Sequence, residues 1–580
     1  MLIKTLLTPA AITLLLFLSN TVHASWVEKS NRYALEVLSD QASISPEWIS
    51  SVGLPGFDSD VSEIGPDIVE REITLNRSII SRLEKQRIKE QNPKVQQDIQ
   101  IMISSLTDSI SRLELERKYL LPYYDIPQLL YYSFNALLDP RVDAKRYPAA
   151  IERLRKYNGQ AEAYRPLTEQ AKARTTALLD KPELLGPYID EVQNNLESAP
   201  HYIAGLRALF EQSALEGWEQ DLALLEQQLK DYSTWVADTV LVRARKDNRL
   251  PLELYINELR SYGVSASPQE LIAEGQYSYQ LIRSQMKALA RQIADKRGWQ
   301  QQDLVSVIHK LKEEQVPQDK LLALYQQRLK TIEDIIEREQ LVSLPERKAV
   351  IRLATEAESA ASPASFMSPP QLINNTGQYG EFVLVQSNPA LGADAQMDDW
   401  SHDAIIWALT VHEARPGHEL QYSRLVEDGT SLARALFAFN SANAEGWGLY
   451  AESIMQAYLP LEGQLFNLYT RLLRAARMFL DPMVNTGQIS RDEAEHFLIE
   501  ETAMSLAMAS SEADRYAFRA PGQATSYYVG YVNLMRLRTE VELRQGDDFD
   551  DKAFHDFILS QGILPPQLLR EAVLEQFVSQ

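Results

Sequence analysis

Apolar residues recur at intervals of three and four along most of this 580-residue chain. That spacing places them on one face of an α-helix. It runs through residues 67–121, 149–244 and 267–339, and it resumes at Ser401 and continues to the C-terminus. Because such helices bury their apolar faces against one another, we predict a mainly α fold with one large helical body.

Two local signals predict where helices begin and end. Asn92 and Pro93 interrupt the first long helical segment, which predicts an antiparallel pair of helices. Ser267 is followed by Pro268 and, three residues after the serine, by Glu270. This is the pattern of a capping box with proline in the first helical position, so we predict a helix start at Ser267.

The stretch from residue 343 to residue 397 is rich in proline and glycine. Its best strand candidate is Phe382–Val385, so we expect a small β element near residues 370–390 at the edge of the helical body. This change in character divides the chain into a helical N-terminal region, 25–340, and a helical region that carries the motifs described below, 341–580. The two regions can still share one core and form a single domain.

The N-terminus has the form of an export signal. Lys4 precedes a mostly apolar run, residues 6–18, which is too short to cross a bilayer of about 30 Å comfortably. Small residues follow, and we predict a signal peptide over residues 1–24 that is cut after Ala24. The alternative is an uncleaved N-terminal anchor. We expect a periplasmic or secreted protein with no stable membrane insertion once the signal is removed.

Composition narrows the classes of partner and chemistry. Lys+Arg 58 and Asp+Glu 80 give a net charge of −22, which argues against nucleic acid and against anionic lipid as partners. The chain contains no cysteine, which excludes disulfides, thiolate metal sites, cysteine nucleophiles and lipid attachment to a cysteine. A metal site must therefore use His, Asp and Glu. The oligomeric state is not readable from the sequence.

The strongest motif is HEARPGH, which begins at His412 and ends at His418. In the zinc-peptidase motif H-E-x-x-H, two histidines four residues apart lie on one helical face. Six residues apart on a straight helix, the two side chains would diverge by about 120°. Pro416 interrupts helical hydrogen bonding and Gly417 can adopt backbone angles closed to other residues, so the chain can loop out and return His418 toward His412. We predict that both histidines bind one metal ion, although the pattern alone also fits a surface helix.

A later carboxylate completes the predicted metal site. Glu445 opens the segment EGWGLYAE, and Glu452 lies on the same helical face within about 20°. Two histidines and Glu445 would leave an open position for water on a single Zn²⁺ ion, and other divalent metals suit the same ligands. Glu413 is placed to take a proton from that water. Glu452 is either a hydrogen-bond partner of a ligand or a contact for a substrate amine. Glu445 alone also fits a helix cap.

At these residues the chain resembles the DUF885 family, bacterial proteins that are large, helical and often exported. The family pattern H-E-G-x-P-G-H-x-L-Q is matched by HEARPGHELQ, with Ala414 in place of the usual glycine. The pattern E-G-W-A-L-Y-A-E is matched by EGWGLYAE. A third block is matched by PGQATSYYVGYVNLMRLR over residues 521–538, and SPQELIAEG from Ser267 is a weaker match. The resemblance covers most of the mature chain.

The resemblance implies a helical body with a deep cleft and a metal held by His412, His418 and Glu445. It also implies that Glu413 acts as the general base. These are the same positions to which the spacing of the residues points.

The third block adds candidates for substrate contacts. Tyr527 would stabilise a developing oxyanion by donating a hydrogen bond, or it is a core aromatic residue. Arg536 and Arg538 would hold a substrate carboxylate as planar forks, or they are surface charges. The family commonly has a histidine where this chain has Asn485. If that histidine shapes the substrate site, specificity or rate differs here.

We predict an exported zinc-dependent hydrolase, specifically a metallopeptidase that acts on short peptides. A deep cleft in a helical body favours short, extended peptides over folded proteins. The strand candidate Phe382–Val385 would align such a peptide by edge pairing, or it is a buried core segment. The alternative is a non-catalytic periplasmic binding or scaffold protein with a structural or vestigial metal site.

Overall fold

The structure is a computed structural model that describes residues 25–355, 358–359, 365–375, 377–385, 399–427 and 429–578. The predicted signal peptide, residues 1–24, lies outside the described residues. No helix in the described ranges combines the length and the apolar character that crossing a bilayer requires.

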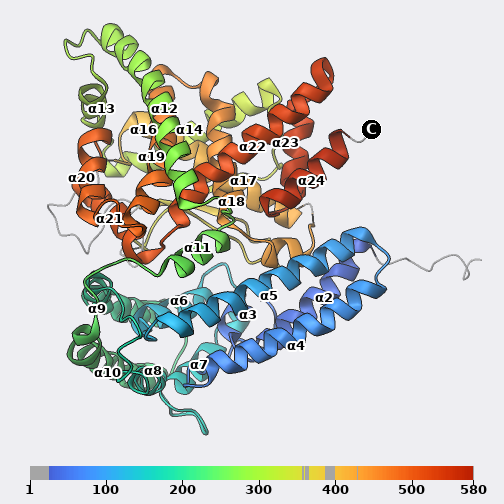
Figure 1. The fold of residues 1–580 in the computed structure, drawn as a ribbon, viewed down its shortest axis with the longest axis vertical. Coiled ribbons are helices and arrows are strands. Elements are labelled where there is room, and N and C mark those ends of the chain that lie inside the picture. Colours follow the sequence, from blue (N-terminus) through green and yellow to red (C-terminus); the bar gives the residue numbers. More distant parts are fainter. Residues whose placement is uncertain are drawn as a thin grey trace, which may run out of the picture.

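The chain up to residue 245 forms the lower body in Figure 1, and it is almost entirely helical. Its α-helices are α2 (Trp26–Gln41), α3 (Pro46–Ser51), α4 (Ile68–Lys89), α5 (Pro93–Tyr119), α6 (Ile126–Leu138), α7 (Ala149–Tyr157), α8 (Leu167–Thr176), α9 (Ile189–Gln212) and α10 (Glu219–Trp235). Short turns of other helix types are η1 (Ala144–Arg146), η2 (Val236–Val240) and η3 (Leu241–Arg243).

The rest of the chain forms the upper body in Figure 1, with α11 between the two bodies. The helices that precede the sheet are α11 (Leu252–Ser261), α12 (Pro268–Arg297), α13 (Leu304–Lys312) and α14 (Gln318–Glu339). Those that follow it are α16 (Asp403–Leu409), η5 (Thr410–Ala414), α17 (His418–Glu427), η6 (Ala433–Phe437), α18 (Ser441–Met455), η7 (Gln456–Tyr458), α19 (Leu461–Asn485), α20 (Arg491–Thr502), α21 (Leu506–Asp514), η8 (Arg515–Arg519), α22 (Gln523–Gln545), η9 (Gly546–Asp548), α23 (Asp551–Ser560) and α24 (Pro566–Phe577).

Both predicted helix boundaries are confirmed. The Asn92 side chain accepts hydrogen bonds from the first backbone N–H groups of α5, which satisfies donors that a helix start leaves free. Ion pairs from Arg77 to Glu114 and from Arg117 to Glu70 show that α4 and α5 run antiparallel. At α12, Ser267 and Glu270 form the reciprocal hydrogen bonds of a capping box.

A three-stranded sheet is the β element that the sequence predicts. Its order is β1 (Val350–Leu353), β3 (Glu381–Leu384), β2 (Phe366–Ser368); β1 runs parallel to β3, and β2 runs antiparallel to it. The strand candidate Phe382–Val385 coincides with β3, but edge pairing of a peptide with it is wrong. Because β3 is the central strand, its backbone is already paired on both sides, and among the described residues β2 is an edge strand instead.

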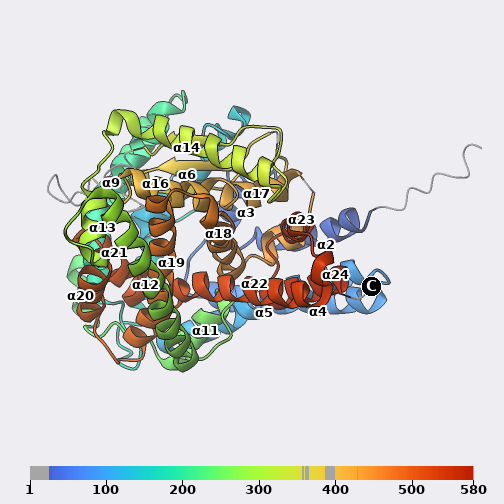
Figure 2. The ribbon, with the colours of Figure 1, turned by 90° about the horizontal axis from the view of Figure 1, so that it is seen from above.

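The apolar core connects the two bodies. One cluster of buried side chains joins residues before position 110, such as Ile99, to Trp447 and Val541 in the upper body. In Figure 2, α18 and α19 lie between α14 and α22. Nearly every residue of α19 from Gly463 onward is buried, including three arginines. Because a buried guanidinium group is costly without an opposite charge or hydrogen-bond acceptors, the groups around these arginines must stabilise them.

Candidate metal centre

The predicted distortion of the histidine segment is present. His412 lies in η5, a π-helical turn that continues α16. Arg415 is extended (φ −123°, ψ 136°), the Arg415–Pro416 peptide bond is cis, and α17 begins at His418. The chain therefore leaves the helix and returns, and the two imidazole ring centroids lie 4.8 Å apart with an interplanar angle of 89°.

The return loop packs against backbone rather than solvent. A Cβ atom at Gly417 would lie 1.9 Å from the carbonyl oxygen of His412 and 2.4 Å from that of Val411. Gly417 is needed because any side chain would collide with this backbone. The sequence analysis had explained the glycine by its unusual backbone angles instead. The indole Nε1 of Trp447 donates a hydrogen bond of 2.9 Å to the carbonyl of Pro416, which ties the loop to α18.

A buried ion pair fixes the other end of the loop. Arg415 is 2% exposed and Glu419 is fully buried, and the two pair at 2.8 Å across the start of α17. Arg415 also reaches Glu333 on α14 at 2.7 Å, and Arg347 pairs with Glu419 at 2.7 Å. Removing one partner would leave a buried charge unpaired, so this network holds the loop in one arrangement.

Helix α18 supplies the predicted third donor and shapes the pocket around it. Glu445 Oε2 lies 3.3 Å from His418 Nε2 and 3.7 Å from His412 Nε2. One turn on, a Cβ at Gly448 would lie 2.6 Å from Cε1 of His412, so the glycine leaves room for the imidazole. The segment EGWGLYAE thus provides a donor, a loop anchor and space for a ring within a single helix.

These three side chains, called the metal triad below, fit a divalent ion. Their potential ligand atoms lie within 4.8 Å of one another, and His412 and His418 are buried. Donors held about 2.1 Å from a tetrahedral ion would lie roughly 3.4 Å apart, close to the 3.3 and 3.7 Å separations from Glu445. The donor set of two imidazoles and one carboxylate is that of catalytic zinc sites.

The hydrogen bond at the far side of His412 orients its ring. Its Nδ1–H donates to Glu452 Oε1 at 2.8 Å, which leaves Nε2 directed toward Glu445. Although burial lowers the pKa of His412, hydrogen bonds to Glu445 and Glu452 raise it to about 9. Glu452 is fully buried and also accepts a hydrogen bond from Thr470 at 2.7 Å. It is therefore the hydrogen-bond partner of His412, and the predicted contact with a substrate amine finds no support in this position.

Replacing Glu452 by Gln is expected to weaken metal binding by about 10- to 100-fold, the usual cost of losing such a partner. A neutral amide keeps the shape and still accepts from His412, but it no longer balances the charge that the ring gains on coordination. The metal dissociation constant can be measured by competition with a coloured chelator. Glu500→Gln, on the exposed face of α20, is the matched control. Unchanged affinity in Glu452→Gln would show that Glu452 is only a packing residue.

A cavity of about 470 Å³ opens onto the metal triad, and both Glu413 and Tyr527 line it. Burial raises the pKa of the Glu413 carboxyl, and the nearby histidines oppose that rise. Within the described residues, Glu413 forms no hydrogen bond or ion pair. The Tyr527 hydroxyl accepts a hydrogen bond of 2.9 Å from Arg515, which orients it while leaving its own proton available. Tyr527 is thus a largely buried aromatic residue that also faces the cavity.

Comparison with known proteins supports the family that the sequence motifs suggest. The sequence model of the family described as "Bacterial protein of unknown function (DUF885)" matches residues 46–573. The chain belongs to the DUF885 family. No curated protein matches it.

Two solved structures have the same fold as this DUF885 chain. One, from Shewanella oneidensis, is described as a candidate lipoprotein of unknown function; its TM-score is 0.74 at 18% identity, covering 95% of this chain and 100% of that one. The other, a candidate lipoprotein from Colwellia psychrerythraea, has a TM-score of 0.76 at 18% identity and covers 96% and 100%. Lipid attachment requires a cysteine, and this chain has none.

Asn485, which stands where the DUF885 family commonly has a histidine, lies outside the cavity lining. Asn485 is buried and donates hydrogen bonds to Asp481 Oδ1 at 3.1 Å and to the carbonyl of Tyr516 at 3.0 Å. Asp481 also accepts from the backbone N–H of Gly522 at 2.9 Å, and burial raises its pKa to about 7. This network secures the corner that leads into α22.

The two arginines predicted from the third DUF885 block do not line the cavity. The Arg536 side chain is 67% exposed and pairs with Glu274 at 2.7 Å. Arg538 pairs with Glu542 at 2.6 Å and donates to the Tyr450 hydroxyl at 3.2 Å. Neither side chain is placed to hold a substrate carboxylate beside the metal triad.

Other arginines, which the sequence interpretation missed, line the cavity. They are Arg474 and Arg477 on α19 and Arg515 and Arg519 of η8, and the first three are called the arginine cluster below. Arg477 forms a two-pronged ion pair with Glu512, at 2.7 and 2.5 Å. A signal for them exists, because arginines recur every third residue in an otherwise apolar helix.

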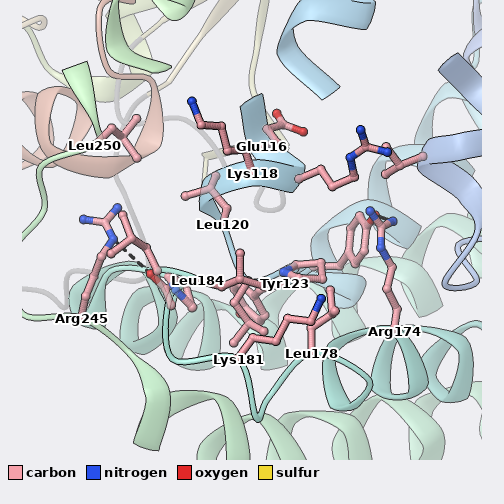
Figure 3. Close-up of a pocket in the computed structure, with 18 of the residues that line it drawn as sticks. Glu116, Lys118, Leu120, Tyr123, Arg174, Leu178, Lys181, Leu184, Arg245 and Leu250 are labelled. Atoms are coloured by element: carbon pink, nitrogen blue, oxygen red, sulfur yellow. Dashed lines mark hydrogen bonds between the residues drawn. The ribbon is translucent and has the colours of Figure 1, made fainter. Parts of the chain in front are cut away.

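Figure 3 shows a larger cavity, of about 770 Å³, that contains no member of the metal triad. Charges of both signs line it, including Glu116, Lys118 and Arg174. Several of its cations are already engaged: Lys118 pairs with Glu253 at 2.8 Å, and Arg245 donates to the carbonyl of residue 186 at 3.0 Å. Cavity size alone therefore does not identify the functional site.

Proposed function

We propose that this protein is a metal-dependent hydrolase that cleaves amide bonds in short peptides. The metal triad matches a catalytic zinc site, and manganese or cobalt would suit the same donors. When bound, such an ion lowers the pKa of a coordinated water and polarises a substrate carbonyl. The cavity volume of about 470 Å³ suits a small ligand rather than a folded protein.

The observation that carries the proposal is the free carboxylate of Glu413. Glu413 is half-buried, and a carboxylate with a structural role in such a position is usually hydrogen-bonded to other protein groups. Glu413 instead lines the cavity next to a metal donor, with no partner among the described residues. There it would take a proton from the attacking water and deliver it to the leaving amine. Burial raises its pKa toward the working range of a general base.

Two further groups would assist. Tyr527, oriented by Arg515, can donate its hydroxyl proton to the oxygen on which negative charge develops. Phe366 and Met367 of β2 line the same cavity, and the edge of β2 that no described strand covers would pair with an extended peptide. Export remains a prediction from residues 1–24.

The alternative is a non-catalytic periplasmic binding or scaffold protein. The sequence argument for it is that Asn485 replaces a histidine common in the family. Asn485 belongs to the Asp481 network rather than to the cavity lining. The alternative also leaves Glu413 without a role. We therefore rank it second.

Metal removal tests the proposal. Elemental analysis of the purified protein is expected to find a single divalent ion per chain. Hydrolysis of a panel of short peptides, followed by mass spectrometry, should cease after dialysis against 1,10-phenanthroline and return when zinc is added. Full hydrolysis by the metal-stripped protein would refute the proposal. Bound metal with no cleavage of any peptide would favour the binding or scaffold alternative.

A further inference from the structure

Arg474, one member of the arginine cluster, lacks the close carboxylate partner that Arg477 and Arg515 have in Glu512. Arg474 is 6% exposed, and its one described hydrogen bond runs to the carbonyl of Thr470 at 3.3 Å. Its Nε is buried without a partner, and so is Nη1 of Arg477. No carboxylate in the described part of the chain forms an ion pair with Arg474.

Glu512 is the carboxylate that faces the cluster. Although burial raises its pKa, Arg477 and Arg515 hold the pKa of Glu512 at about 2, so this carboxylate stays ionised. Its two oxygens are taken by Arg477, and Arg515 lies 3.5 Å away. Glu512 is thus engaged by Arg477 and Arg515, whereas Arg474 has Glu445 and Glu452 nearby but forms an ion pair with neither. Burial and the charge of Arg477 lower the pKa of Arg474, as expected for a cation without a partner.

An unpaired buried guanidinium is costly unless a ligand compensates it. Guanidinium groups present planar pairs of N–H donors that match a carboxylate. The cluster lines the same cavity as Glu413 and the metal triad, so an anion bound there belongs to the molecule that is cut. An unmodified peptide has a carboxylate at its C-terminus. Acidic side chains offer the same chemistry, but a protein with a net charge of −22 repels highly acidic peptides.

We propose that Arg474, flanked by Arg477 and Arg515, binds the C-terminal carboxylate of the substrate, so that the enzyme removes residues from the carboxyl end of short peptides. This inference rests on the proposed hydrolase function. Tyr527 lies beside the arginine cluster, with Arg477 4.7 Å and Arg515 5.2 Å from its ring centroid, and it lines the same cavity as the metal triad. The substrate terminus and the developing oxyanion would thus be held by neighbouring groups.

The test compares peptides that differ only at the C-terminus. An N-acetylated tetrapeptide of neutral residues is prepared as the free acid and as the amide. A third peptide, an amide that ends in glutamate, supplies a side-chain carboxylate instead. Binding is measured by calorimetry on the zinc-loaded Glu413→Gln protein, and hydrolysis on the zinc-loaded parent protein. We expect the free acid to bind and react about 10- to 100-fold better than the neutral amide, as a charge-assisted pair predicts.

Three variants test whether Arg474 causes the preference for the free acid over the amide. Arg474→Met keeps the length of the side chain but not its charge, and it should lose the preference for the free acid. Arg474→Lys keeps the charge but not the planar fork, and it should retain part of the preference. The matched control is Arg471→Met, because Arg471 lies one turn earlier on α19, is also buried and does not line the cavity. It should behave like the parent protein.

The outcomes separate this inference from the proposed function. Equal binding of acid and amide, or an undiminished preference in Arg474→Met, would overturn the carboxylate site while hydrolysis stands. Preferential binding of the acid without hydrolysis of any peptide would remove the enzymatic proposal and keep the binding site. If the glutamate-ending amide matched the free acid, assignment to the C-terminus would be wrong. Circular dichroism checks that Arg474→Met folds. If it does not fold, the peptide comparison in the parent protein and the behaviour of Arg474→Lys still test the carboxylate site.

Discussion

Replacing Glu413 by Gln is expected to lower kcat for peptide hydrolysis by about 10²- to 10⁴-fold, the usual contribution of a general base. The amide has nearly the same size but cannot accept the proton of the attacking water. Metal content should not change, because Glu413 is not one of the three donors. Steady-state kinetics and elemental analysis on the same preparation check both expectations. Hydrolysis at the parent rate would show that another group is the base.

Replacing His418 by Ala is expected to remove the metal and the activity together. Two donors would remain, and the loss in affinity should exceed the about 10- to 100-fold effect expected for a ligand's hydrogen-bond partner. Elemental analysis after gel filtration should find little metal, and hydrolysis should fall to background. His496→Ala is the matched control, because His496 lies on the exposed face of α20. Retention of a tightly bound ion by His418→Ala would mean that His418 is not a ligand.

The two variants together distinguish the base from the ligands. Glu413→Gln should keep the ion and lose turnover, whereas His418→Ala should lose both. A protein whose metal is only structural would show a different pattern, because Glu413→Gln would then change neither metal content nor any measured activity.

Local signals in the sequence predicted much of the fold and the centre of the site. Helix starts at Asn92 and Ser267 depend on interactions within one turn, so the sequence alone reveals them. The spacing of His412 and His418 indicated a distortion because a straight helix would hold them apart. The π-helical turn before the loop was not predicted, because it depends on packing against α14 and α18 rather than on composition.

The substrate-facing arginines show where sequence reasoning stops. Arg474 and Arg536 both lie on helices that mix apolar and charged residues, and the helical pattern does not say which one faces the cavity. The rotation of each helix about its axis decides this, and long-range contacts fix that rotation. The same limit explains β3: its apolar residues indicated a strand, but its central position depends on β1 and β2.

One contact between helices has a wider consequence. A Cβ at Gly446 would lie 2.5 Å from the backbone of Gly530, and one at Gly530 would lie 1.7 Å from the carbonyl of Ala442, so α18 and α22 touch backbone to backbone. Glu445 and Tyr527, on these two helices, therefore move as a single rigid part. Substitutions in β2 or η8, which line the cavity, are therefore expected to change which ligands it accepts without changing the separation of Glu445 and Tyr527.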